Sequence, residues 1–238
     1  MKNEGNDEKT SLTAKTETNT ENKADLMDKP ARKKKQSSRI QREKRELILT
    51  AALDVFAANG FRGSTIDQIA VAAGLSKPNL LYYFANKEEM HQTLIERLMD
   101  TWLDPLKAIR ADGQPMAEIC AYIKRKLQMS RDFPKESRLF ANEILQGAPR
   151  IISMIEGELK NLVDQKAAVI QGWMDKGQLN PCDARHLLFA IWATTQHYAD
   201  FDVQVRSVLA EDTQHDAHFD DAALFLENLF CKGLKPRD

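Results

Sequence analysis

The strongest restriction on the fold of this 238-residue chain comes from the stretch TIDQIAVAAGLSKPNLLYYF, which marks two short helices at their ends. Thr65 precedes Gln68 by three residues, the spacing of a capping box at a helix start. Gly74 can end this helix, and Ser76 can cap a second one, in which Pro78 falls in the first turn, where no backbone donor is needed. Two short helices joined by a glycine-containing turn predict a helix-turn-helix, whose second helix enters the major groove of DNA.

The second short helix begins with side chains that can read bases. Lys77 can donate to guanine or to a phosphate, and Asn79 can pair with adenine. Tyr82 and Tyr83 are expected on the flank, where their hydroxyls reach phosphates, although core packing is an alternative for Tyr83. We expect Thr65 and Lys87 to add backbone contacts, because helix starts favour anions. The expected DNA-contacting residues are Thr65, Ser76, Lys77, Pro78, Asn79, Tyr82, Tyr83 and Lys87.

Three apolar residues of the same helix are expected to face inward at helical spacing, namely Leu80, Leu81 and Phe84. The rest of the chain also has helical periodicity, and no run alternates apolar and polar residues as a half-buried strand would. Gly60 is a natural end for the first helix, and Asn180-Pro181 is a typical helix start. Apart from the two short helices, the expected helices cover residues 39–60, 87–109, 115–131, 135–146, 149–176, 181–203 and 217–232.

The charge of the chain is unevenly distributed, which favours a polyanionic partner for its N-terminal part. Residues 1–87 contain 16 Lys and Arg against 11 Asp and Glu, whereas the remainder contains 18 against 24. Residues 1–38 contain no aromatic residue and are rich in polar ones, so we expect a disordered tail. From Lys29 to Arg45 the chain has nine basic residues and one acidic residue, and this basic run is either a solvated segment or an arm that adds phosphate or minor-groove contacts.

Several classes of protein are disfavoured by the sequence. The three cysteines are far apart and form no C-x-x-C pair, which argues against a disulfide framework or a zinc site and predicts a cytoplasmic protein. No apolar run is long enough to span a bilayer, so no membrane partner is expected. An enzyme with a helical substrate domain is an alternative, but no phosphate-binding glycine loop, G-x-S-x-G or H-E-x-x-H motif occurs. We therefore expect no catalytic residue, metal or cofactor.

Residues 61–88, FRGSTIDQIAVAAGLSKPNLLYYFANKE, resemble the DNA-binding domain of TetR-type transcriptional regulators. This resemblance implies an all-α homodimer that binds a double-stranded operator and usually represses until a small molecule releases it. The implied domains are a disordered tail over residues 1–38, a three-helix DNA-binding domain over 39–86, and a larger helical ligand-binding and dimerisation domain over 87–238. A ligand-independent DNA-binding protein remains an alternative.

The C-terminal half is similar to the regulators of pyrimidine utilisation within that family. Three stretches carry this similarity: WLDPLKAI from Trp102, SRDFPKESRLF from Ser130 and WATTQHYADF from Trp192. The resemblance implies a pyrimidine effector such as uracil or thymine. In the last stretch, neutral polar residues follow the apolar part of a helix, a pattern that suits a pocket for a neutral ligand. The expected ligand-binding residues are Trp102, Tyr122, Trp173, Trp192, Thr195, Gln196 and Tyr198.

Other residues in this half have two interpretations. His197 is interpreted as a buried or interface histidine rather than a ligand contact, and Arg138 either forms a surface salt bridge or faces a ligand carbonyl. The last helix carries an apolar stripe that is expected to dimerise with the helix beginning at Pro181, although packing within its own chain is the alternative. That stripe consists of Phe219, Ala222, Ala223, Leu226, Leu229 and Phe230.

Overall fold

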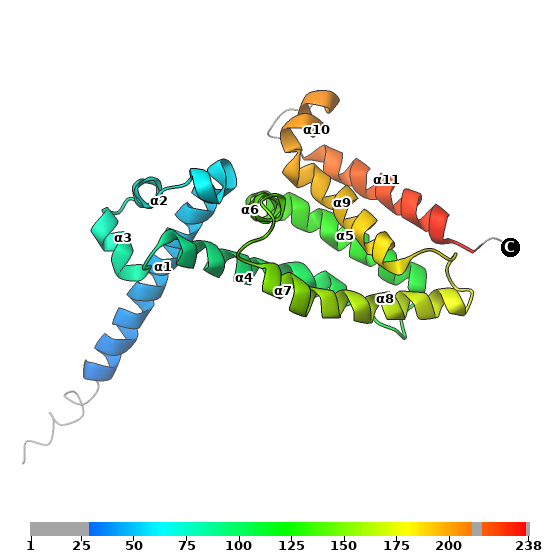
Figure 1. The fold of residues 1–238 in the computed structure, drawn as a ribbon, viewed down its shortest axis with the longest axis horizontal. Helices are drawn as coiled ribbons and strands as arrows, with labels where there is room; N and C mark the ends of the chain where they lie inside the picture. Colours follow the sequence, from blue (N-terminus) through cyan, green and yellow to red (C-terminus); the bar gives the residue numbers. More distant parts are fainter. Residues whose placement is uncertain (1–28, 211–215, 237–238) are drawn as a thin grey trace, which may run out of the picture. The chain divides into compact units, whose positions relative to one another are not determined.

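The computed structural model describes residues 29–210 and 216–236, with side chains from Arg39 onward, and these residues form helices and connecting turns without any strand (Figure 1). The helices are α1 (Lys29–Gly63), α2 (Ile66–Ala72), α3 (Lys77–Tyr83), α4 (Lys87–Lys107), α5 (Pro115–Asp132), α6 (Pro134–Leu145), α7 (Ile152–Met154), the π-helical turn η1 (Ile155–Leu159), α8 (Lys160–Asp175), α9 (Ala184–Asp200), α10 (Asp202–Leu209) and α11 (Ala217–Leu234). The expectation of an all-α fold is confirmed.

The chain divides into two compact units, residues 1–43 and residues 44–238. The expected disordered tail lies in the first unit, and its residues 1–28 are outside the described residues. Residues 29–38 belong to α1, so in this part of the tail the structure differs from the expectation. Helical backbone is compatible with this composition, because alanine, lysine, arginine and glutamine all have high helix propensity.

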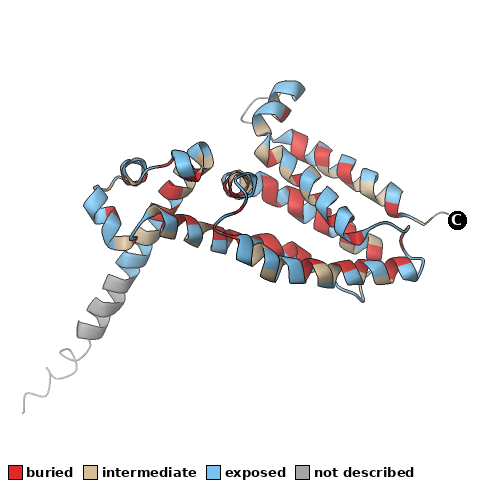
Figure 2. Cartoon of the chain, viewed as in Figure 1, coloured by how far each residue is buried: buried red, intermediate tan, exposed pale blue. Residues whose placement is uncertain are grey.

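The second unit is built around one continuous apolar core. Buried residues run from Ile48 in α1 to Leu234 in α11, and Figure 2 shows them on the inner sides of helices whose outer sides are exposed. Helix α5 packs against α9 and α11, while α4 contacts α5, α6 and α8. The long helix α4 therefore extends from the N-terminal helices into the C-terminal bundle.

The helix starts predicted from capping signals at Thr65 and Ser76 are confirmed, whereas the one at Asn180-Pro181 is wrong. Helix α9 begins only at Ala184, because Asp183 accepts hydrogen bonds from the backbone N–H groups of Arg185 and His186. The Asn180 amide instead donates to the carbonyls of Gly233 and Lys235 at 3.0 and 2.7 Å. Asn180 thus ties the α8–α9 loop to the end of α11, a long-range role that a local capping pattern does not reveal.

The first helical segment ends at Gly60 as expected, because its backbone has a φ of 65° and leaves the helical conformation before a short helical segment that continues to Gly63. One other boundary differs from the expectation. The helix expected over residues 181–203 is divided at Phe201 into α9 and α10.

Candidate DNA-binding surface and effector cavity

The turn between α2 and α3 has the geometry that its caps predict. The Thr65 hydroxyl accepts from the backbone N–H of Gln68 at 3.2 Å, and the Gln68 side chain accepts from the N–H of Thr65 at 2.8 Å. Gly74 has a φ of 65°, a left-handed conformation that glycine adopts at little cost. The Ser76 hydroxyl accepts from the N–H of Asn79 at 3.4 Å and starts α3. The predicted helix-turn-helix is therefore present.

The inner side of α3 is fixed by apolar packing and by a part-buried cation–π contact. Leu80 and Phe84 are fully buried, as expected, whereas the Leu81 side chain is 38% exposed and does not face inward. The Arg45 guanidinium lies 3.9 Å from the Phe84 ring centroid and donates to the carbonyl of Tyr83. Arg45 therefore holds the end of α3 against α1, although its place in a basic run suggested a solvent-facing residue.

The outer side of α3 exposes most of the side chains that were expected to contact DNA. Ser76, Lys77, Pro78 and Asn79 are all exposed, and Tyr82 is 71% exposed. Lys77 forms a 2.9 Å ion pair with Asp67 in which both side chains are about half exposed. Such a surface pair contributes little stability, so it can be exchanged for a phosphate or base contact. Tyr83 is half-buried and packs against the core, the alternative considered above.

Lys87 differs from the expectation. Its ammonium group donates to the carbonyls of Phe61 and Ser64 at 2.9 Å each and lies 4.4 Å from the Phe61 ring centroid. These carbonyls are at the end of α1, where cations stabilise a helix. Lys87 is thus a structural cap between α1 and α4 and is not one of the proposed DNA-contacting residues. Thr65, in contrast, is exposed at the start of α2.

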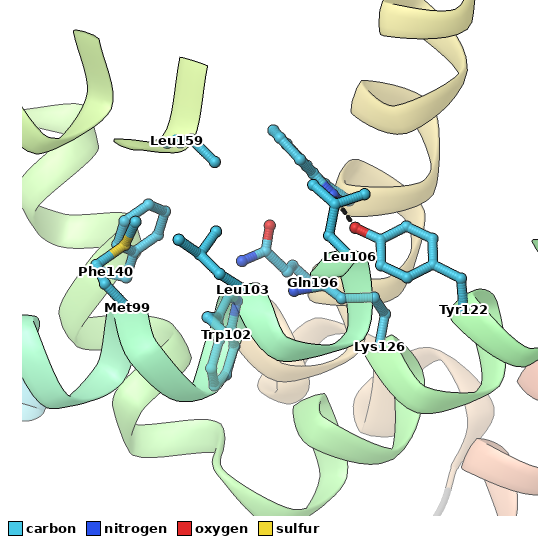
Figure 3. A pocket seen from close by; sticks show the side chains of 10 residues that line it. Met99, Trp102, Leu103, Leu106, Tyr122, Lys126, Phe140, Leu159 and Gln196 are labelled. Carbon is cyan, nitrogen blue, oxygen red and sulfur yellow. Dashed lines mark hydrogen bonds between the residues drawn. The ribbon is translucent and has the colours of Figure 1, made fainter. Parts of the chain in front are cut away.

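A narrow cavity of about 50 Å³ lies in the C-terminal bundle (Figure 3). Four of the seven expected ligand-binding residues line it, namely Trp102, Tyr122, Trp192 and Gln196. The other lining residues are Met99, Leu103, Leu106, Lys126, Phe140 and Leu159. The sequence therefore predicted the cavity in part, with contributions from α4, α5, α6, η1 and α9.

The remaining three expected residues have structural roles. Trp173 is buried, and its indole N–H donates to the carbonyl of Ala111 at 3.2 Å. Thr195 is fully buried and donates to the carbonyl of Ile191 at 2.7 Å within its own helix. The Tyr198 ring lies 6.0 Å from that of Phe219 on α11. Thr195 and Tyr198 lie on α9, which borders the cavity, whereas Trp173 lies on α8, which contributes no lining residue.

Tyr122 is positioned to donate a hydrogen bond into the cavity. The Trp192 indole N–H donates to the Tyr122 hydroxyl oxygen at 2.5 Å, as the dashed line in Figure 3 shows. The hydroxyl proton of Tyr122 is therefore left for another acceptor. Burial raises the pKa of Tyr122 far above its ordinary value, so this group remains a neutral donor.

Lys126 is the main feature of the cavity that sequence reasoning missed. Its side chain is 2% exposed, and its Nζ lies 4.7 Å from the Trp102 ring centroid. Among the described residues the ammonium has no hydrogen-bond or ion-pair partner. Burial lowers the pKa of Lys126 to about 7, and the more distant Asp200 carboxylate partly opposes this change. In the sequence Lys126 is the last residue of a Lys-Arg-Lys run that suggests a solvated face, although its spacing from Tyr122 and Ile123 places it on the apolar face of α5.

Arg138 and His197 lie outside the cavity. Arg138 donates to the carbonyl of Ala199 at 3.4 Å and lines a wider neighbouring cleft of about 510 Å³. Gln196 and Phe140 line both spaces, so the cleft adjoins the cavity. His197 is exposed and stacks on Phe201 with ring centroids 5.0 Å apart, so it is not buried within its own chain, and an interface role stays a prediction.

A buried polar cluster that no sequence pattern indicated connects the N-terminal helices with α6. The Glu143 carboxylate, which is buried, accepts from the Arg150 guanidinium and backbone N–H, both at 2.9 Å. His91 Nε2 lies 3.7 Å from the same carboxylate, and the Arg150 guanidinium lies 3.4 Å from the Phe61 ring centroid. Burial lowers the pKa of His91 to about 4, so this imidazole is neutral at physiological pH.

The exposed apolar surface of the last helix overlaps the expected stripe only in part, at Leu229. Phe219, Ala222 and Leu226 are buried within the chain, so that part of the predicted dimerisation stripe packs internally. An adjacent face of α11 exposes Leu224, Phe225 and Leu229, and Phe189 of α9 is also half exposed. These four residues define an apolar surface, here called the α9–α11 face.

Comparisons with known proteins agree with this architecture. Residues 48–94 match the family described as bacterial regulatory proteins, tetR family, and residues 95–237 match the C-terminal region of YcdC-like proteins. The chain is 46% identical over 200 residues to the HTH-type transcriptional regulator RutR of Escherichia coli O157:H7, covering 84% of this chain and 94% of that protein. These relatives are transcriptional regulators and not enzymes.

Two solved structures are similar in fold. The ketosteroid transcriptional regulator KstR2 of Mycobacterium tuberculosis has a TM-score of 0.64 at 19% identity, covering 81% of this chain and 95% of that one. AibR, solved with isovaleryl coenzyme A and operator DNA, has a TM-score of 0.62 at 17% identity, covering 78% and 97%. Among the helices of residues 29–210 and 216–236, none is long and apolar enough to cross a membrane.

Proposed function

The chain belongs to the TetR family of DNA-binding transcriptional regulators, and we propose that it is a repressor released from a palindromic operator by a small pyrimidine such as uracil or thymine. Its proposed domains are an N-terminal DNA-binding domain ending near residue 86 and a C-terminal domain for ligand binding and dimerisation. Lys77 and Asn79 are the proposed base-reading residues, with Thr65, Ser76, Pro78, Tyr82 and Tyr83 supporting them.

The chemistry of the cavity carries the proposal of a pyrimidine effector. A pyrimidine base offers two carbonyl acceptors, ring N–H donors and a flat face. Lys126 and Tyr122 provide donors for the carbonyls, and the Gln196 amide can donate and accept at once. The volume of about 50 Å³ exceeds the 10–15 Å³ that one water needs, yet it is far below the ~300 Å³ of drug-sized pockets, which favours a compact ligand. The resemblance to regulators of pyrimidine utilisation supports the same class.

Ligand release of DNA requires that the ligand prefer the arrangement that does not bind DNA. Helix α4 provides a connection, because its first turns carry Lys87 and His91 beside α1, whereas Trp102 and Leu103 line the cavity. Helix α6 provides a second connection through Phe140 in the cavity and Glu143 in the polar cluster. A shift of either helix would change the separation of the two recognition helices in a dimer.

Calorimetric titration with uracil, thymine and uridine tests the effector. We expect heat with the two free bases, a weaker response with the bulkier uridine, and a clear loss of affinity in Gln196→Ala. Heat with none of the three, combined with intact DNA binding, would contradict the pyrimidine effector while leaving a regulator that answers to another ligand. An operator affinity unchanged by any bound base would favour the ligand-independent alternative.

Replacement of Asn79 with alanine is expected to weaken operator binding by about 10–100-fold, the discrimination typical of one bidentate base contact. Operator DNA can be selected with the wild-type protein from a random duplex library and compared with unselected duplex in mobility-shift assays. Binding to unselected duplex should change little in Asn79→Ala, because only phosphates are contacted there. Lys77→Ala gives the parallel test, and Lys160→Ala, which alters an exposed lysine on α8, serves as the control. Equal losses on both DNAs would show that these side chains touch only phosphate.

Replacement of Leu224 with aspartate is expected to convert a dimer into a monomer. The Leu224 side chain is 64% exposed on the α9–α11 face, and a two-fold interface contains every substitution twice. We expect the dimer dissociation constant to rise by at least about a hundredfold, measured by sedimentation equilibrium. Leu145→Asp on α6 alters a similarly exposed leucine as a control and should leave the dimer unchanged. An unchanged mass for Leu224→Asp would place the interface elsewhere.

A further inference from the structure

The cavity carries one formal positive charge and no negative one. Lys126 is its only ionic side chain among the described residues, and the other polar groups that line it are the Tyr122 hydroxyl, the Gln196 amide and the indoles of Trp102 and Trp192. A buried ammonium without a charged partner is costly, and a buried ionisable group with a strongly perturbed pKa in a cavity is a candidate for a functional site.

The elements packed around Lys126 do not supply that charge. On the side of α4, the Lys126 ammonium lies against the Trp102 ring, whose attraction for a cation replaces only part of the lost hydration. From α9 the nearest acid is Asp200, which forms no ion pair with Lys126 and accepts a 2.6 Å hydrogen bond from Ser137 of α6. Arg138 of α6, which also lies near Asp200, adds positive charge, and Tyr122 on α5 itself is neutral.

We propose that Lys126 is a specificity-determining residue that makes the cavity select ligands able to carry a negative charge, so that acidic ring N–H heterocycles bind in ionised form. This inference rests on the proposed function, because it names the charge of the ligand at the same cavity. The ammonium pairs with the deprotonated ring nitrogen or the adjoining carbonyl oxygen, over which that charge is delocalised. Gln196 and the Tyr122 hydroxyl then fix the orientation of the ring.

Binding in this form changes the number of bound protons. Burial holds the pKa of Lys126 at about 7, so at pH 8 much of the free protein carries the neutral amine. A ligand that is already ionised in solution raises that pKa, and one proton is taken up from solution as the amine becomes an ammonium. A ligand that is neutral in solution gives its own ring N–H proton to the amine, without net exchange with the solvent. At pH 6 the lysine is already charged, and an anion that is already ionised binds without proton uptake. The difference is measurable as a dependence of calorimetric heat on the ionisation enthalpy of the buffer.

The direct test compares ligands of nearly equal shape and increasing ring N–H acidity. Thymine, uracil, 5-fluorouracil and 6-azauracil form this series, and in 6-azauracil a ring nitrogen replaces one C–H group. At pH 7.5 we expect the wild-type affinity to rise by about tenfold or more from uracil to 6-azauracil, a difference that one charged contact readily supplies. In Lys126→Met, which keeps the length of the side chain and removes its charge, the ratio should fall to about threefold or less.

Gln196→Ala provides the matched control, because it removes a neutral contact from the same cavity. Its affinities should fall throughout the series while the preference for 6-azauracil remains. Equal preference in wild type and Lys126→Met, or no preference in wild type, would overturn the inference while leaving a pyrimidine effector intact.

A second pair of probes keeps the inference testable when no pyrimidine binds. Benzoate and benzamide are planar and similar in size, but only benzoate is charged. The wild-type protein should then bind benzoate more tightly, and Lys126→Met should lose that preference. If neither the pyrimidine series nor this pair shows the expected preference, both the charge selection and the pyrimidine effector are overturned. If only the benzoate preference is observed, the charge selection stands and the pyrimidine effector is rejected.

Discussion

Replacement of Glu143 with alanine is expected to lower the free energy of unfolding by about 3 kcal/mol. Removing one partner of a buried ion pair typically costs about 3–5 kcal/mol, because the other charge loses its compensation. The lower end applies here, since the Arg150 side chain remains 24% exposed and can recover part of its hydration. The backbone N–H of Arg150 also loses its acceptor.

Urea unfolding at fixed protomer concentration measures this loss, and for a chain of this size it corresponds to a fall of about 6–12 °C in melting temperature. Lys160→Ala is the control, because it breaks the exposed Lys160–Asp164 pair and should cost less than about 1 kcal/mol. A loss for Glu143→Ala no larger than that of the control would show that the carboxylate does not hold the Phe61 end of α1 to α6.

Replacement of Lys126 with methionine is expected to raise the free energy of unfolding at pH 7 by on the order of 3 kcal/mol. A pKa lowered from 10.5 to about 7 means that the unfolded state holds the lysine proton more tightly than the folded state. Each unit of difference is equivalent to about 1.4 kcal/mol, and the loss of the Trp102 cation–π contact offsets about 1–2 kcal/mol of the gain.

The sign of this effect fixes its pH dependence. Below pH 7 both states are charged, and the penalty of the buried lysine is fully present. Between pH 7 and 10.5 the unfolded state binds more protons than the folded state, so wild-type stability contains a contribution that rises with pH. The advantage of Lys126→Met should therefore shrink between pH 7 and 9.5 in urea unfolding. Lys124→Met, which alters a lysine that is 62% exposed and paired with Glu227, should show no such trend.

A gain in stability accompanied by a loss of charge selectivity would be typical of a functional residue, because sites for ligands are often built at the expense of stability. If Lys126→Met were destabilising at every pH, the buried ammonium would have a partner in solution that the structure does not contain. The two measurements on this variant, unfolding and ligand affinity, are independent of each other.

The features that the sequence predicted well are those that depend on neighbouring residues. The capping box of Thr65 and Gln68, the turn at Gly74 and the cap at Ser76 lie within a few positions of the groups they contact, so local spacing determines them. The errors involve contacts between residues distant in the chain. The Lys87 ammonium donates to carbonyls more than twenty residues away in the chain, and the Asn180 amide donates to carbonyls more than fifty residues away.

The cavity was predicted only in part, because it too depends on contacts between residues distant in the chain. Helical spacing identified aromatic residues that face the interior, but it could not decide which interior face borders a cavity. Trp102 and Trp192 border it, whereas Trp173 meets the Ala111 carbonyl instead. Lys126 was missed because a lysine among other cations suggests solvent, and only tertiary packing shows that this one is enclosed.

The roles of Arg45 and Lys87 also bear on how tightly the protein holds DNA as ionic strength changes. Both cations are engaged within the fold, one on Phe84 and the Tyr83 carbonyl, the other on two carbonyls at the end of α1. Neither is therefore placed to displace condensed counterions from the double helix, and Lys77 must first leave Asp67. The DNA-binding domain thus releases fewer counterions than its formal charge implies, and a larger share of its affinity comes from contacts that salt does not screen.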